Sequence, residues 1–112
     1  MTSFLYRHRA AGIPWGLWVR VHYRWTPDLE YALVWTSRAS EEDRALFEKG
    51  LLRAGPLAGR LEITQIDTLG TDFQPEAMFL VGVGVAAQIT GDEPDYPEVR
   101  FDRAKNVYVV GP

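Results

Sequence analysis

The side chains best suited to bind a partner form a stripe along one predicted strand. In residues 17–25 the odd positions are apolar, and the even positions hold Trp18, Arg20, His22 and Arg24. This period-two alternation is typical of a strand with one buried and one solvent-exposed face, so these four side chains should share the exposed face. Arginines interleaved with aromatic rings can pair with phosphates and stack on bases, and the same residue types dominate protein–protein interfaces. The stripe could equally be a solvated surface whose arginines pair with nearby acids.

Two further groups of residues could extend this surface or form a second one. Arg100 and Tyr108 lie in the last predicted strands, and we expect them to join the exposed sheet face. Residues 70–76 have the composition of a helix start, and a free helix N-terminus can hold an anion. Asp72 and Glu76 already place negative charge there, so ordinary helix capping is the alternative interpretation.

Residues that could catalyse a reaction or hold a metal are too few or wrongly spaced. The chain has no cysteine, and its only histidines are His8 and His22, whereas a zinc site needs three or four convergent ligands. No Gly-x-Ser-x-Gly motif marks a nucleophile, although a triad assembled in space would leave no such trace. Gly82 and Gly84 fall within a predicted helix rather than in a dinucleotide-binding loop, and residues 92–95 offer too few oxygen ligands for calcium. We therefore expect no catalytic residue, no metal and no cofactor.

Length and composition are those of one small domain. The chain has 112 residues, of which 46% are hydrophobic and 24% are charged, enough for a single core but not for two ordinary domains. Its net charge of −3 argues against a general nucleic-acid binder. The charge is unevenly distributed, because residues 1–27 contain four arginines and no acid, whereas all fifteen acids follow them. With no cysteine, no signal-peptide pattern and no apolar run long enough to span a bilayer, we expect a cytoplasmic protein without membrane contact.

Hydrophobic periodicity and turn residues predict seven elements in the order β-β-α-β-α-β-β. The strands are expected at 17–25, 30–36, 61–69, 99–101 and 106–110, with one helix between Ser40 and Gly55 and a second at 77–89. The turn at 26–28 should make the first two strands a hairpin. We expect residues 1–112 to form one domain of the α+β class, with residues 1–14 as a flexible N-terminal segment. The predicted architecture is a two-layer sandwich, in which a mostly antiparallel sheet of four to five strands carries two helices on one face.

Local signals mark how the two helices begin and pack. Ser40 precedes three acids and should cap the first helix by accepting a hydrogen bond from a free backbone N–H. In the second helix, Gly82 and Gly84 each lower helix propensity by roughly 1 kcal/mol relative to alanine. We expect a close backbone approach to a strand to compensate for that loss.

One stretch of the sequence is similar to a known family. The run Phe47-Glu48-Lys49-Gly50-Leu51-Leu52, followed by Gly55-Pro56-Leu57-Ala58-Gly59, resembles the helix and following loop of domain IV of translation elongation factor G. Residues 17–89 also follow that family's order of strands and helices. The resemblance implies a two-layer α/β sandwich that does no chemistry itself and reaches the decoding region of the ribosome with loops at its tip. By position, the tip-loop residues here would be Pro14, Trp15, Thr71, Asp72, Phe73 and Gln74.

These observations lead to three hypotheses of function. The first, which the resemblance supports, is a non-catalytic binding module that contacts RNA or a ribosome-associated partner. The second is a protein–protein interaction module, such as an acidic inhibitor or immunity-type protein that covers a basic partner. The third is a small-molecule-binding domain with a pocket lined by Trp15, Trp25, Trp35 and Tyr31. An open sheet with short edge strands could also pair with its own copy, so a homodimer is a further expectation.

Overall fold

A computed structural model describes residues 2–111 of the chain. In that range the elements follow one another in the order β-β-β-α-β-α-β-β. They are β1 (Thr2–His8), β2 (Leu17–Thr26), β3 (Ala32–Trp35), α1 (Glu41–Leu51), β4 (Arg60–Thr68), α2 (Glu76–Thr90), β5 (Val99–Asp102) and β6 (Val107–Val110). The predicted α+β class is confirmed.

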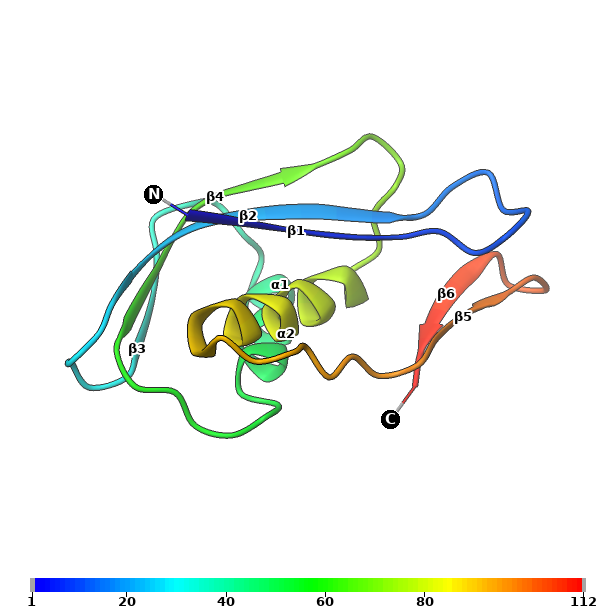
Figure 1. Ribbon diagram of the computed structural model, residues 1–112. Helices are drawn as coiled ribbons and strands as arrows, with labels where there is room; N and C mark the ends of the chain where they lie inside the picture. The colour runs from blue at the N-terminus through cyan, green and yellow to red at the C-terminus, as the bar shows by residue number, and fades with distance from the viewer. Residues whose placement is uncertain (1, 112) are drawn as a thin grey trace.

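The structure has two layers, with the main sheet above and the helices below in Figure 1. The sheet contains four strands in the order β1-β2-β4-β3, and both helices cover the same face of it. β1 with β2 and β2 with β4 are antiparallel, whereas β3 runs parallel to β4. β5 and β6 form a separate antiparallel hairpin, which lies at the end of the molecule where β1 ends and β2 begins (Figure 1). The last two strands therefore do not extend the main sheet. A main sheet of five strands would have required one of them to do so.

The N-terminal segment is an edge strand rather than a flexible extension. Thr2–His8 pairs with β2 along its whole length, from Thr2 opposite Tyr23 to His8 opposite Leu17. Tyr6 is buried in the core, and the Phe4 ring lies against Gly84 of α2. The sequence signal for this strand is weak, because Leu5 on the outer face breaks the alternation of polar and apolar residues. Contacts with α2 and β2 stabilise this strand although its local sequence pattern is weak.

The expected hairpin between residues 17–25 and 30–36 is wrong. β4 lies between β2 and β3 and pairs with both of them. The connection from β3 through α1 to β4 is a crossover, which makes β3 and β4 parallel. β4 carries the fully buried Leu61 and Ile63, so it takes a central position, whereas β3 has only four half-buried residues and forms the edge.

A bulge in β4 explains the imperfect alternation of that segment. His22 pairs with Gln65, but the next residue, Tyr23, pairs with Ile63. Thr64 is therefore an extra residue in β4, and its hydroxyl donates to the His22 carbonyl at 3.2 Å. Because of this insertion, Ile63 and Ile66 both pack on the core although they are three positions apart.

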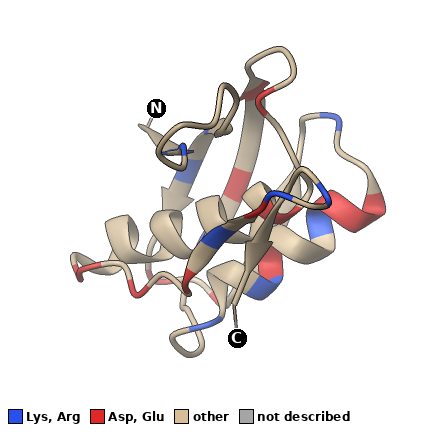
Figure 2. Cartoon of the chain, turned by 90° about the vertical axis from the view of Figure 1, so that its right-hand side faces the viewer, with Lys and Arg blue, Asp and Glu red and all other residues tan. Residues whose placement is uncertain are grey.

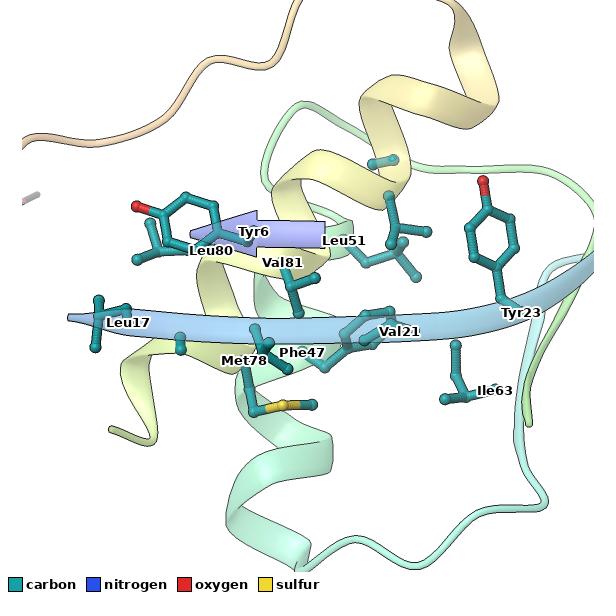
Figure 3. Close-up of a cluster of buried hydrophobic side chains, with 14 of the residues drawn as sticks. Tyr6, Leu17, Val21, Tyr23, Phe47, Leu51, Ile63, Met78, Leu80 and Val81 are labelled. Carbon is teal, nitrogen blue, oxygen red and sulfur yellow. The ribbon is translucent and has the colours of Figure 1, made fainter. Parts of the chain in front are cut away.

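The core fills the space between β2 and the two helices, as Figure 3 shows. Val19 and Val21 of β2 are fully buried against Phe47 of α1 and Val81 of α2. The side chains at the intervening positions of β2 are half-buried or exposed, which agrees with the predicted alternation along 17–23. Trp25 departs from it, since its side chain is 37% exposed and its indole N–H donates to the Ala58 carbonyl at 3.2 Å.

The two helices touch backbone to backbone through glycines. A Cβ added at Gly82 would collide with the carbonyl oxygen of Phe47 in α1, and one added at Gly50 would collide with the carbonyl oxygen of Phe79 in α2. Gly82 therefore compensates for its poor helix propensity by approaching a helix, not the strand that the sequence interpretation expected. Gly84 does face a strand, because it makes room for the Phe4 ring of β1.

Helix α1 begins as the sequence predicts. Ser40 is the N-cap residue, and its hydroxyl accepts a hydrogen bond from the backbone N–H of Asp43 at 3.1 Å. Glu41, Glu42 and Asp43 occupy the first turn, where negative charge is favoured. α2 has no side-chain cap, so the capping role considered for Asp72 is not realised.

We expect Gly82→Ala to lower the free energy of unfolding by about 1–3 kcal/mol, because the new methyl group must separate α1 from α2. At a helix position with free space around it, the same change would raise the free energy of unfolding by about 1 kcal/mol. The direction of the change therefore shows whether the two helices are in backbone contact at Gly82. Urea unfolding followed by circular dichroism measures the change. The exposed control Lys49→Ala should shift the value by less than about 0.5 kcal/mol. A stabilised Gly82→Ala protein would contradict the backbone contact.

Buried tyrosines make stability sensitive to high pH. Burial raises the pKa of Tyr6 from 10.0 to about 12. The folded state therefore favours the neutral phenol, and this contribution is complete below pH 10 and is lost as the pH rises toward 12. Tyr6→Phe cannot ionise, so we expect its unfolding free energy to fall less steeply than that of the wild type between about pH 9 and 12. Equal slopes in urea titrations would show that Tyr6 ionises freely in the folded protein.

Candidate functional site

The face of the main sheet that points away from the helices carries the predicted stripe. Three strands contribute to this surface, which we call the open face. Its members are Ser3, Leu5, Arg7, Trp18, Arg20, His22, Arg24, Glu62, Gln65 and Asp67. None of these side chains is fully buried, so all can meet a partner.

One end of the open face is internally paired. The His22 Nε2 atom lies 2.7 Å from Asp67 Oδ2, and the Gln65 amide donates to Asp67 Oδ1 at 2.7 Å. These hydrogen bonds, first that of Gln65 and then that of His22, hold the pKa of Asp67 below its usual value. Arg24 lies 3.6 Å from Glu62. This end has the character of a solvated surface in which cations meet neighbouring acids.

The other end of the open face holds cations that make no close ion pair with a described residue, although Asp67 stands opposite Arg20 in the register and the charge of Arg20 contributes to the lowered pKa of Asp67. The Arg20 guanidinium lies over the Trp18 ring, 5.3 Å from its centroid, which is a cation–π distance. Arg7 of β1 stands directly opposite Trp18 in the strand register. Within residues 2–111, neither arginine has a carboxylate within 4.0 Å, and neither does the exposed Arg9. We call Arg7, Arg9, Trp18 and Arg20 the basic end.

A cavity of about 380 Å³ opens beside the basic end. Its walls are Arg7, His8, Arg9, Gly16, Leu17, Trp18 and Asp72. The Trp18 backbone N–H donates to the Asp72 carbonyl at 2.8 Å, which fastens the loop before α2 to the start of β2. Both predicted tip loops therefore come to the same end of the molecule as Trp18. The sequence interpretation treated these loops and the stripe as separate surfaces, whereas the structure makes them neighbours.

Tyr108 does not lie on the open face. Its side chain is 2% exposed, and its hydroxyl donates to the Trp15 carbonyl at 2.7 Å and accepts from the Ala10 N–H at 3.1 Å. The rings of His8, Trp15 and Phe101 surround it edge-on. Arg100 is exposed on β5, also away from the main sheet. Both predictions fail because β5 and β6 form their own hairpin.

The tip-loop residues divide into exposed and structural ones. Pro14 and Thr71 are exposed, and Asp72 is half-buried in the wall of the cavity. Trp15 is held by its indole N–H, which donates to Asn106 Oδ1 at 3.1 Å, and Phe73 packs against the core. Gln74 is a clamp: its amide donates to the Tyr108 carbonyl at 2.6 Å and accepts from the Tyr108 N–H at 2.8 Å.

The aromatic residues proposed to line a small-molecule pocket have separate neighbours. Trp15 packs on Tyr108 at the hairpin, and Trp35 packs on Phe47 of α1. Tyr31 donates its hydroxyl to Glu48 at 2.7 Å, and this bond adds to burial in raising the pKa of the phenol. Trp25 lies against the loop before β4. Together these contacts indicate packing roles.

Arg7 and Arg9 are the residues of the basic end that sequence reasoning missed. Both precede the first predicted strand, in the segment assumed to be flexible. The available signal was the concentration of arginines in residues 1–27 with no acid among them. Only the pairing of β1 with β2 brings Arg7 beside Trp18.

Comparisons with known proteins assign no family to the chain. No protein-family model, no curated protein and no solved structure matches the chain. Among the described residues, no helix is both long and apolar enough to cross a membrane. The resemblance to domain IV of elongation factor G stays a prediction.

We expect Gln74→Ala to destabilise the fold by about 1–3 kcal/mol, because it leaves both backbone groups of the buried Tyr108 without their partner. Hydrogen exchange at the Tyr108 amide should accelerate by more than the global loss of stability explains. Thr71→Ala, in the same loop but exposed, is the matched control and should change neither quantity. Unchanged exchange in the Gln74 variant would show that the hairpin is held by its aromatic contacts alone.

Proposed function

We propose that this protein is a non-catalytic binding module that holds single-stranded RNA on the basic end of its open face. One arrangement carries the proposal: Arg20 lies over the Trp18 ring at 5.3 Å, Arg7 stands opposite Trp18, and in the described chain neither arginine makes an ion pair within 4.0 Å, although Asp67 stands opposite Arg20. Side chains arranged in this way offer an aromatic surface and positive charge at the same place.

Each group of the basic end has a distinct part in this binding mode. The half-buried Trp18 presents a ring on which an unstacked base can lie, and Arg20 adds a guanidinium plane beside it. Arg7 and Arg9 lie on the wall of the neighbouring cavity, where they can pair with phosphates. A β-sheet face with an aromatic residue is a common platform for single-stranded RNA because stacking does not require a particular base.

Charge elsewhere on the molecule limits where RNA can bind. Figure 2 shows basic residues spread over several elements and interleaved with acidic ones. Acids gather at the first turn of α1 and in residues 92–98, and two further acids lie at the basic end itself: Asp67 opposite Arg20, and Asp72 in the cavity wall. With a net charge of −3, the protein should repel RNA over most of its surface and bind it locally. Three arginines give a salt dependence with a slope of about −2 in log K against log salt concentration.

The resemblance to domain IV of elongation factor G supports an RNA partner over other classes. That domain reaches the ribosome with the loops that correspond here to residues 11–16 and 70–74. In this chain the two loops meet beside Trp18, through the bond between Trp18 and Asp72. RNA held at the basic end would therefore also touch the exposed tip of these loops.

We expect the protein to bind a labelled oligouridine at low salt, and Trp18→Ala to weaken this binding by about tenfold, the range typical of a lost stacking platform. Arg7→Gln with Arg20→Gln should weaken it similarly and reduce the salt slope. Fluorescence anisotropy measures both effects, and circular dichroism verifies folding.

The matched control is Arg38→Gln with Arg53→Gln, which removes the same charge from exposed positions just before and just after α1. We expect its affinity to stay within about twofold of the wild type. If both double variants lose the same affinity, attraction is non-specific and the basic end is not a site. If the wild type binds no RNA but retains a stoichiometric protein from a lysate, and Trp18→Ala releases that protein, the open face is a protein interface instead.

A further inference from the structure

The outer side of β1 is an unprotected strand edge. β1 lies at the end of the sheet, and beyond its pairing with β2 the backbone of Thr2–His8 makes no hydrogen bond to another described residue. The strand is seven residues long, contains no proline or glycine, and pairs with β2 without a register shift. The opposite edge is different, because β3 has only four residues. Proteins usually protect a long, regular edge with a bulge, a proline or a covering segment. β1 has no bulge and no proline, and in the described chain the segment after α2, whose Tyr96 packs edge-on against Tyr6, makes no backbone hydrogen bond to the strand.

The sequence of β1 is complementary to itself. If two copies pair antiparallel so that all seven residues overlap, Leu5 faces Leu5 of the second copy across a two-fold axis. Ser3 then faces Arg7 of the second copy on the open face, and Phe4 faces Tyr6 of the second copy on the core side. Arg7 is the only residue of Thr2–His8 with a fixed charge, so this register places no like charges opposite each other.

Other registers are less favourable. A shift of two residues toward the C-terminal end shortens the overlap and moves Arg7 opposite Leu5 of the second copy. A shift of four residues brings the two Arg7 side chains face to face. The register with full overlap is thus the one that satisfies most backbone groups and separates the arginines.

We propose that β1 is a dimerisation edge, through which two copies of this chain join their sheets in antiparallel register around Leu5. The joined sheet has eight strands, and both open faces lie on the same side of it. The two basic ends then belong to one continuous surface. The dimer does not depend on RNA, and a monomeric protein would leave the proposed RNA site untouched.

Two substitutions of Ser3 should change the stability of the dimer in opposite directions. Ser3 is exposed and lies outside the basic end, so its substitution should not disturb folding. Ser3→Glu creates two symmetric pairs with Arg7 of the other copy, and we expect it to tighten the dimer by about fivefold. Ser3→Arg opposes two like charges and should weaken the dimer by a similar factor. Sedimentation equilibrium over a range of protein concentrations measures the dissociation constants. Ala104→Glu and Ala104→Arg, in the exposed turn of the hairpin, repeat the charge changes away from β1 and should have no effect.

A single cysteine gives a second, independent readout. The chain has no cysteine, so any disulfide in Leu5→Cys must join two copies. Mild oxidation should convert most of this variant to a covalent dimer, because Leu5 meets its own copy at the axis, whereas Thr71→Cys should stay monomeric. The proposal is overturned if the wild type and Ser3→Glu remain monomers at every concentration. It is also overturned if a dimer forms but the Ser3 substitutions leave its dissociation constant unchanged and Leu5→Cys does not cross-link.

Discussion

The contact on which the rest of the structure depends is the backbone approach of α1 to α2 at Gly50 and Gly82. Side chains at these two positions would collide with the carbonyl oxygens of Phe79 and Phe47. Because the helices can come this close, both fit under one face of a four-stranded sheet and share its core. Glycine is costly inside a helix, and the gain from burying Phe47 and Val81 against β2 offsets that cost. With both helices on one side, the other face of the sheet has no layer to cover it.

The uncovered face is not uniform, and its two ends suit different roles. Around His22 and Arg24, hydrogen bonds and ion pairs with Asp67 and Glu62 satisfy the polar groups within the molecule. Around Trp18, the arginines have a ring beside them and make no ion pair within 4.0 Å of a described carboxylate, although Asp67 stands opposite Arg20. A partner that brings phosphates and unstacked bases would supply what this end lacks. The Tyr108 hydroxyl and the Gln74 side chain hold the hairpin and the loops in place beside this end.

Local sequence signals predicted the elements whose formation depends on residues that are close together in the chain. The alternation along 17–23, the Ser40 cap and the apolar run of α2 correspond to real elements, because burial or capping depends there on a few neighbouring residues. Strand order did not follow from the sequence, since β4 must insert between β2 and β3, which are earlier in the chain. Of the site, Trp18 and Arg20 could be found from periodicity, whereas Arg7 could not. It joins them only through the pairing of β1, a strand whose own pattern is broken by Leu5.

The most direct test of an RNA site at the basic end is a nuclear magnetic resonance titration of the labelled protein with oligouridine. Four indole N–H signals report on different places, since those of Trp15 and Trp25 are held by Asn106 and Ala58, and Trp35 packs on Phe47. An RNA site at the basic end predicts saturable shifts of the Trp18 indole and of the Arg7 and Arg20 amides, with the Trp25 and Trp35 indoles unchanged. Shifts confined to the β5–β6 hairpin or to α1, or no shifts at low salt, would contradict it.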